Sequence, residues 1–106
     1  MHQRLSSSEI NTRLQELDNW TLDAHKTSLN KEWEFDSFKT AMGFFVHVGE
    51  LAEAHNHHPE LLSSYTQMRI HLTTHDAYGL TCKDFELAMQ IDQLIIQKFS
   101  NLLMER

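Results

Sequence analysis

The sequence has few of the residues that cross-link, bend or loosen a chain. Cysteine occurs once, at Cys82, proline once, at Pro59, and glycine three times in 106 residues. One cysteine excludes an internal disulfide and fits a reducing compartment. The three glycines are isolated, which excludes a phosphate-binding glycine loop, and no nucleophilic serine elbow is found. Without a linker, repeat or low-complexity segment, the chain is expected to form one domain over residues 1–106.

Long apolar runs and clusters of positive charge are also missing. No apolar run approaches the length of a membrane span, and the stretch MHQRLSSSE lacks the apolar core of a secretory signal. The net charge is −6, and the nine Lys and Arg residues are scattered. This charge distribution disfavours nucleic acid or an anionic membrane surface as a direct partner. We therefore expect a cytoplasmic protein that binds neither.

The N-terminal third of the chain predicts a helix followed by two strands. Ser6 and Glu9 have the spacing of a capping box. The helix behind them has three apolar side chains on one face: Ile10, Leu14 and Leu17. A strand is expected around 20–23, and a second strand over 29–35 pairs with it through the AHKTS turn. In the second strand the odd-numbered residues share one side and the even-numbered residues the other.

A long helix is predicted next, in SFKTAMGFFVHVGELAEAHN, with Asp36 as its N-cap. One face of this helix holds four residues at helical spacing: Phe38, Met42, Phe45 and Gly49. About twenty residues make roughly 30 Å of helix, which is enough to cross a small sheet. Because Pro59 restricts His58 to an extended conformation, the helix is expected to end near His57.

The second half of the chain predicts two more strands and a final helix. The stretch SSYTQMRIHLTTH is rich in residues that favour strands, Tyr65 among them. Gly79 marks a turn, and Thr81 and Asp84 have capping spacing before the last helix. That helix has a buried stripe of six apolar residues: Leu87, Ala88, Ile91, Leu94, Ile95 and Phe99. The order α-β-β-α-β-β-α predicts an α+β fold, an antiparallel four-stranded sheet with helices packed on one face.

Three histidines fall within four positions in AEAHNHHPE. A zinc site needs three or four ligands that converge. His57 and His58 are adjacent, so their side chains diverge. His55 meets His58 only if the helix continues to His58, which Pro59 disfavours. Since no cysteine cluster adds further ligands, we expect no metal site.

A further histidine, His75, follows LTT at a strand end and precedes an acidic, glycine-containing loop, where functional sites are common. A helix end and a strand end meet readily in a two-layer domain, so His57, His58 and His75 form the best candidate constellation. Four more histidines are expected on the surface, a helix face or a sheet face and are not site candidates: His2, His25, His47 and His71. Neutral imidazole, with a pKa of about 6.5, both gives and takes a proton near neutrality, which suits the addition or removal of water.

The spacing of these residues is shared with a known family. The chain carries, in this order, Glu53, His57-His58-Pro59, Tyr65, His75 and Asp84. With the stretches NHHPE, LTTHD and GLT, and with WTL and F-x-x-A-x-x-F upstream, the chain resembles the pterin-4a-carbinolamine dehydratase family over nearly its whole length. Family members often carry an aromatic residue shortly after HHPE and an apolar residue before the tyrosine. This chain departs from that pattern at Leu61, Leu62 and Ser64.

The resemblance implies an activity and roles for individual residues. The family removes water from 4a-hydroxytetrahydropterin to give quinonoid dihydropterin, which regenerates the cofactor of aromatic amino-acid hydroxylases. It uses no metal and no organic cofactor. The resemblance implies His57, His58 and His75 as the catalytic residues. His57 and His75 are implied as the acid/base residues at the 4a-hydroxyl, and His58 as a residue that binds and orients the pterin and assists at N5. The residues implied to bind or orient are Glu53, Thr74 and Asp84. The first of these would orient His57 from one helical turn earlier.

The resemblance also implies partners and alternatives. The family forms dimers and tetramers, so a homodimer or homotetramer is expected, with the apolar final helix as a contact surface. Some animal relatives bind a homeodomain transcription factor as dimerisation cofactors, which leaves a protein-interaction module as an alternative function. A dehydratase acting on another pterin, such as one in molybdopterin metabolism, is a further alternative.

Overall fold

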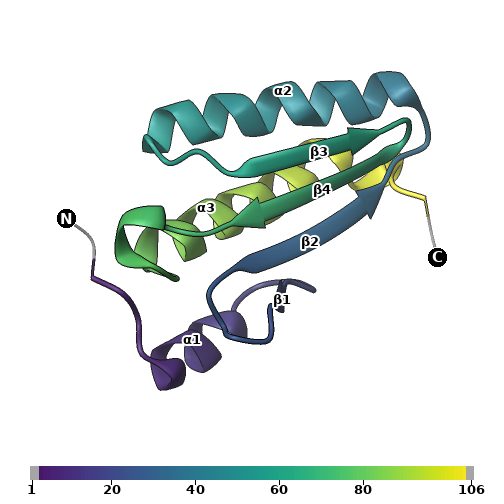
Figure 1. Cartoon of the computed structure of the whole chain (residues 1–106). Coiled ribbons are helices and arrows are strands. Elements are labelled where there is room, and N and C mark those ends of the chain that lie inside the picture. The colour runs from purple at the N-terminus through teal and green to yellow at the C-terminus, as the bar shows by residue number, and fades with distance from the viewer. Residues whose placement is uncertain (1–2, 105–106) are drawn as a thin grey trace.

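A four-stranded antiparallel sheet with helices packed along one face makes up the fold (Figure 1). The computed structural model describes residues 3–104. Its helices are α1 (Ser7–Leu14), α2 (Phe38–His55) and α3 (Cys82–Leu94), and its strands are β1 (Thr21–Leu22), β2 (Leu29–Glu34), β3 (Glu60–Ser64) and β4 (Gln67–Leu72). The strand order is β1-β2-β4-β3, and all neighbours are antiparallel. The predicted fold class and element order are confirmed.

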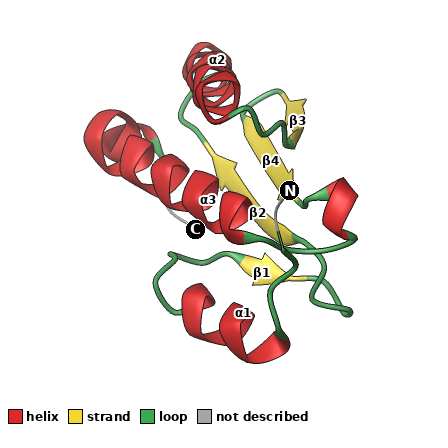
Figure 2. Cartoon of the chain, turned by 90° about the vertical axis from the view of Figure 1, so that its left-hand side faces the viewer, coloured by secondary structure: helices red, strands yellow, loops and turns green. Residues whose placement is uncertain are grey.

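The alternation of side chains gives the sheet one apolar and one polar face. The helices α2 and α3 lie on the same side of the strands (Figure 2). Beneath them the sheet contributes buried apolar residues from β2 and β4: Leu29, Trp33, Met68, Ile70 and Leu72. The predicted sidedness of β2 is therefore confirmed.

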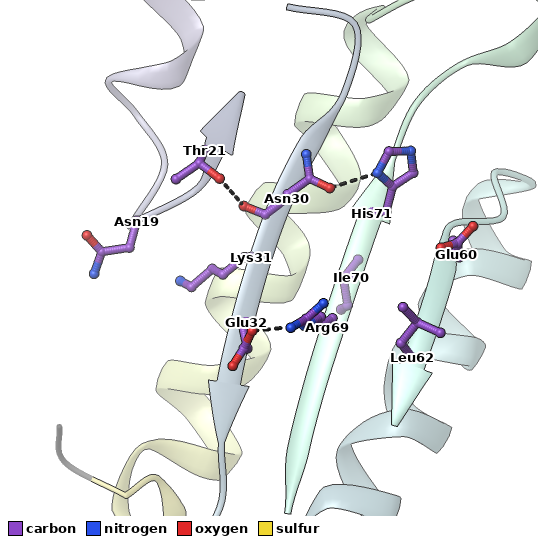
Figure 3. A pocket seen from close by; sticks show the side chains of 10 residues that line it. All are labelled: Asn19, Thr21, Asn30, Lys31, Glu32, Glu60, Leu62, Arg69, Ile70 and His71. Carbon is purple, nitrogen blue, oxygen red and sulfur yellow. Dashed lines mark hydrogen bonds and ion pairs between the residues drawn. The ribbon is translucent and has the colours of Figure 1, made fainter. Parts of the chain in front are cut away.

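The polar face of the sheet carries pairs of side chains that reach from strand to strand (Figure 3). Arg69 Nε donates to a carboxylate oxygen of Glu32 (2.9 Å), and the His71 ring pairs with the side-chain oxygen of Asn30 (2.7 Å). These pairs line a shallow hollow of about 520 Å³. His71 is thus a sheet-face residue, as predicted.

The start of α2 differs from the prediction. Ser37 is the N-cap, because its hydroxyl oxygen accepts a hydrogen bond from the backbone N–H of Thr40 (3.1 Å). The backbone N–H of Asp36 instead donates to the carbonyl of Leu102 (2.8 Å), which ties the chain before α2 to the C-terminal segment. The prediction of Asp36 as N-cap is therefore wrong. None of the helices in residues 3–104, α2 included, is long and apolar enough to cross a membrane.

The buried face of α2 is also different from the face singled out by its spacing. Four residues of α2 are buried against the sheet and α3: Ala41, Phe44, Val48 and Ala52. Phe44 is fully buried, with its ring centroid 5.1 Å from that of Trp33. The adjacent row of α2 leaves three large apolar residues exposed: Phe38, Met42 and Val46. Because both rows are apolar, helical periodicity alone does not identify the one that packs.

The second hairpin differs from the prediction at Tyr65, whereas the final helix agrees with it. Tyr65, expected within a strand, lies in the turn between β3 and β4 with a left-handed backbone (φ 55°). For α3, the capping box of Thr81 and Asp84 is present, and all six residues of the expected stripe are buried. The helix continues beyond Leu94 as a π-helical segment, Ile95–Phe99.

Asp23 fixes the turn between β1 and β2. Its carboxylate accepts hydrogen bonds from the backbone N–H and hydroxyl of Thr27 (2.6 Å each) and from the N–H of Ser28 (2.9 Å). Burial raises the pKa of Asp23, but these hydrogen bonds outweigh burial and lower the pKa to about 2. The carbonyl of Thr27 then accepts from the hydroxyl of Thr73 (2.7 Å), which ties this turn to the end of β4.

Candidate functional site

The candidate site lies between three segments that are far apart in sequence: the end of α2, the end of β4 and the start of α3. Helix α2 ends at His55, because Asn56 adopts a left-handed conformation (φ 49°). This places His57 and His58 in the connection from α2 to β3. Lys83 of α3 donates from Nζ to the carbonyl of Asn56 (3.1 Å), so the end of α2 is held against the start of α3.

His57 is bound to a buried carboxylate. Its Nε2 lies 2.5 Å from Oδ1 of Asp84, 27 positions further along the chain. His57 is 8% exposed and Asp84 is fully buried. The capping box fixes the carboxylate, because Oδ2 of Asp84 accepts from the backbone N–H of Thr81 (3.0 Å). One aspartate thus both caps α3 and holds an imidazole.

The same carboxylate reaches the end of β4. The Thr74 hydroxyl donates to Oδ2 of Asp84 (2.7 Å) and lies 2.9 Å from the hydroxyl of Thr81. Thr74 directly precedes His75, which begins the 3₁₀ turn His75–Ala77 and is exposed. The buried network therefore connects His57 to the backbone that carries His75. Within residues 3–104, the His75 side chain itself makes no hydrogen bond.

The contact with Asp84 determines which nitrogen of His57 carries the proton. An ionised carboxylate only accepts hydrogen bonds, so Nε2–H of His57 is the donor. In the neutral ring, Nδ1 then carries a lone pair and is able to accept a proton from a substrate. The same contact fixes the orientation of the His57 ring.

His58 pairs with Glu53 rather than standing alone. Its Nε2 lies 2.5 Å from Oε2 of Glu53, and both side chains are well exposed, at 61% and 77%. Glu53 was expected to orient His57, but the left-handed Asn56 ends the helix before the next turn, and His58 takes that partner instead. An exposed pair of this kind contributes little to stability. It leaves the imidazole of His58 accessible to a ligand.

The remaining candidates fall outside this network. Within residues 3–104, no group of three or more His, Cys, Asp and Glu side chains is arranged to hold a metal ion. His47 lies on the face of α2 with Nδ1 2.8 Å from the carbonyl of Gly43, and His25 is exposed. His2 lies outside the described residues. The hollow on the polar sheet face has His71 in its lining but none of the three candidate histidines.

Two residues of the network were not singled out from the sequence as site residues. Thr81 was seen only as a capping residue, although its N–H and hydroxyl both take part in the Asp84 network. Lys83 gave no signal, because a lysine in the first turn of a helix is ordinarily a solvated residue. Its contact with Asn56 depends on the way that α2 and α3 approach each other.

Comparison with known proteins identifies the family. The family model described as "Pterin 4 alpha carbinolamine dehydratase" matches residues 3–94. The chain belongs to this family. A protein of Roseiflexus sp. (strain RS-1), named "Putative pterin-4-alpha-carbinolamine dehydratase", is 44% identical over 95 residues, covering 90% of this chain and 100% of that protein. A protein of the same name from Solibacter usitatus is 46% identical over 94 residues, covering 89% and 97% of the two chains.

Two solved structures share the fold of this chain. The crystal structure of a "transcriptional coactivator/pterin dehydratase" from Brucella melitensis matches with a TM-score of 0.82 and 32% identity, covering 86% of this chain and 97% of that chain. A "pterin dehydratase-like protein" described as a RuBisCO assembly factor in the alpha-carboxysome matches with a TM-score of 0.63 and 22% identity, covering 73% and 89%. The second likeness concerns the fold alone.

Proposed function

We propose that this chain removes water from 4a-hydroxytetrahydropterin, giving quinonoid dihydropterin, by acid/base catalysis at histidine. The observation that carries the proposal is the buried contact between His57 and Asp84, extended through Thr74 to the backbone of His75. It supplies what the chemistry requires, which is one imidazole with a fixed proton and a free nitrogen, and a second imidazole on an adjacent segment. Family membership supports the choice of a pterin as substrate.

The reaction moves two protons and breaks one bond. A protonated imidazole donates to the 4a-hydroxyl, the C4a–O bond breaks, and water leaves. A neutral imidazole takes the proton from N5, and the electron pair of the N5–H bond forms the C4a=N5 double bond. His57 and His75 carry these two roles, one at the 4a-hydroxyl and one at N5. Each positioned acid or base contributes about 10²–10⁴-fold.

His58 and Glu53 act on binding in this proposal. His58 lies next to His57 in the chain, and its ring is held by the Glu53 carboxylate while most of it stays exposed. A histidine fixed in this way is suited to contact the pterin and to assist at N5. Because this exposed pair contributes little to the stability of the fold, its role in this proposal is substrate binding.

The biological setting proposed is the recycling of tetrahydropterin for aromatic amino-acid hydroxylases. The test of the activity is a stopped-flow measurement with synthetic 4a-hydroxytetrahydropterin. We expect the purified protein to accelerate dehydration well above the uncatalysed decay. A trace identical to the uncatalysed decay, recorded with folded protein, would instead favour a protein-interaction module. Acceleration restricted to a different pterin would reassign the substrate and keep the chemistry.

We also propose that the chain forms a homodimer or homotetramer. The last helix was expected to provide the contact, but its apolar stripe is buried in its own domain. The exposed apolar row of α2 is better suited, since Phe38, Met42 and Val46 recur at helical spacing and are 51%, 37% and 57% exposed. A second copy that presents the same row would remove these side chains from water by a two-fold contact.

A further inference from the structure

Tyr78 is an exposed aromatic residue three positions after His75, one of the candidate histidines. It closes the 3₁₀ turn His75–Ala77, and its backbone N–H donates to the carbonyl of His75 (3.1 Å). The residue is 83% exposed, and its backbone is left-handed (φ 57°, ψ 35°). This conformation is uncommon for a bulky side chain and costs conformational free energy.

Packing within residues 3–104 gives no reason for an aromatic ring at this position. Tyr65 also has a positive φ (55°), but its ring stacks on that of Phe38 with the centroids 6.4 Å apart. In the described part of the chain, the ring of Tyr78 has no such partner. The backbone is strained, and the exposed ring, three positions from His75, has no partner among the described residues. These two observations point to a ligand as the missing partner.

The loop that carries Tyr78 is held from more than one side. Thr74 and Gly79 exchange backbone hydrogen bonds (3.0 and 3.4 Å) across its base, and the hydroxyl of Thr74 is bound to the buried carboxylate of α3. The side chain of Arg4 lies over Gly79, where an added Cβ would come within 2.8 Å of Arg4 Nε. Tyr78 is therefore kept one 3₁₀ turn from His75 on a support that is fixed before a ligand binds.

We propose that Tyr78 is a substrate-binding residue, whose phenol ring stacks on the flat pyrimidine half of the pterin. This inference rests on the proposed function and names a contact that selects planar heteroaromatic substrates. In the pyrimidine half only C4a changes from tetrahedral to trigonal when water leaves, whereas C2, C4 and C8a stay trigonal throughout. Stacking on that part of the ring therefore stabilises the substrate and the transition state to about the same extent. Such a contact lowers KM and leaves kcat unchanged.

Two substitutions and a matched control test the proposal. Tyr78→Ala removes the ring, and Tyr78→Phe removes only the hydroxyl. Both changes fall on an exposed residue, so folding is expected to be retained. Tyr65→Ala removes the other exposed tyrosine with a left-handed backbone, in the turn between β3 and β4. Dehydration is followed by stopped flow, and binding of 6-methylpterin, a flat probe that does not react, by calorimetry.

For Tyr78→Ala we expect KM and the 6-methylpterin Kd to rise roughly 10-fold, with kcat within twofold of the wild type. Tyr78→Phe and Tyr65→Ala should match the wild type in all three values. A Tyr78→Ala protein with unchanged KM and Kd overturns the inference and leaves the dehydratase activity standing. A wild-type protein that neither binds 6-methylpterin nor accelerates dehydration overturns the proposed function, and this inference with it.

Discussion

Replacing Asp84 by Asn separates the role of this residue in catalysis from its role as a cap. Asn keeps the shape of Asp84 but offers one acceptor oxygen and one N–H₂ donor. In the wild type, the N–H of Thr81 and the hydroxyl of Thr74 both donate to Oδ2 of Asp84. The amide oxygen of Asn is expected to take the place of Oδ2 and to accept both hydrogen bonds. The amide N–H₂ then faces Nε2 of His57. Since two donors repel, His57 must move its proton to Nδ1, which removes the lone pair that accepts the substrate proton.

The expected magnitude follows from these contacts. Loss of one positioned base lowers kcat by about 10²-fold or more, and replacement of a charged acceptor by a neutral one lowers the free energy of unfolding by about 1–3 kcal/mol. Stopped-flow kinetics measure the first, urea unfolding the second, and ring ¹⁵N chemical shifts report the position of the His57 proton. Ser6→Ala is the matched control, because it weakens the other capping box by about 1 kcal/mol without touching the site. A folded Asp84→Asn protein with kcat within threefold of the wild type would refute this reasoning.

Three further expectations concern pH, binding and assembly. The pKa of Asp23 is lowered to about 2, so its ionised carboxylate stabilises the fold by about 1–2 kcal/mol above pH 4, and this stabilisation is lost as the pH falls towards 2. Urea unfolding at several pH values should show a smaller pH dependence of stability in Asp23→Asn than in the wild type. An unchanged pH dependence would contradict this expectation. His58→Ala should raise KM more than it lowers kcat, and a loss confined to kcat would make His58 a catalytic rather than a binding residue. Val46→Glu places a charge in the exposed apolar row of α2 and should lower the molecular mass measured by light scattering. Thr12→Glu, at an exposed position of α1, should leave the mass unchanged. A wild-type protein that is monomeric at micromolar concentration would rule out the proposed α2 interface.

The parts of the fold that were predictable are those that local chemistry decides. The capping box of Thr81 and Asp84 fixes the start of α3 within four residues, so it is visible in the sequence. The sidedness of β2 follows from strict alternation. The buried row of α2 was not predictable in the same way, because Phe44 and Phe38 belong to neighbouring rows that are both apolar. Only the position of α3 and the sheet decides between them.

The candidate site was predictable in composition but not in pairing. His57, His58 and His75 could be selected from the sequence, and their roles stay a prediction. The contact of His57 with Asp84 joins residues 27 positions apart and depends on how α2 meets α3. The exchange of partners at Glu53 depends on one left-handed residue, Asn56, that ends the helix early. For Asp84 the sequence predicts a cap and the resemblance implies an orienting role, but neither indicates that its carboxylate is fully buried against His57.

One kinetic comparison tests most directly whether His57 and His75 transfer protons without a metal. Turnover of 4a-hydroxytetrahydropterin is measured by stopped flow for the wild type, His57→Ala, His75→Ala and the double variant, each before and after dialysis against EDTA. We predict a loss of roughly 10²-fold for each single variant, a clearly larger loss for the double variant, and no effect of EDTA. Activity that EDTA abolishes and zinc restores would contradict the acid/base account and make the histidine cluster a metal site.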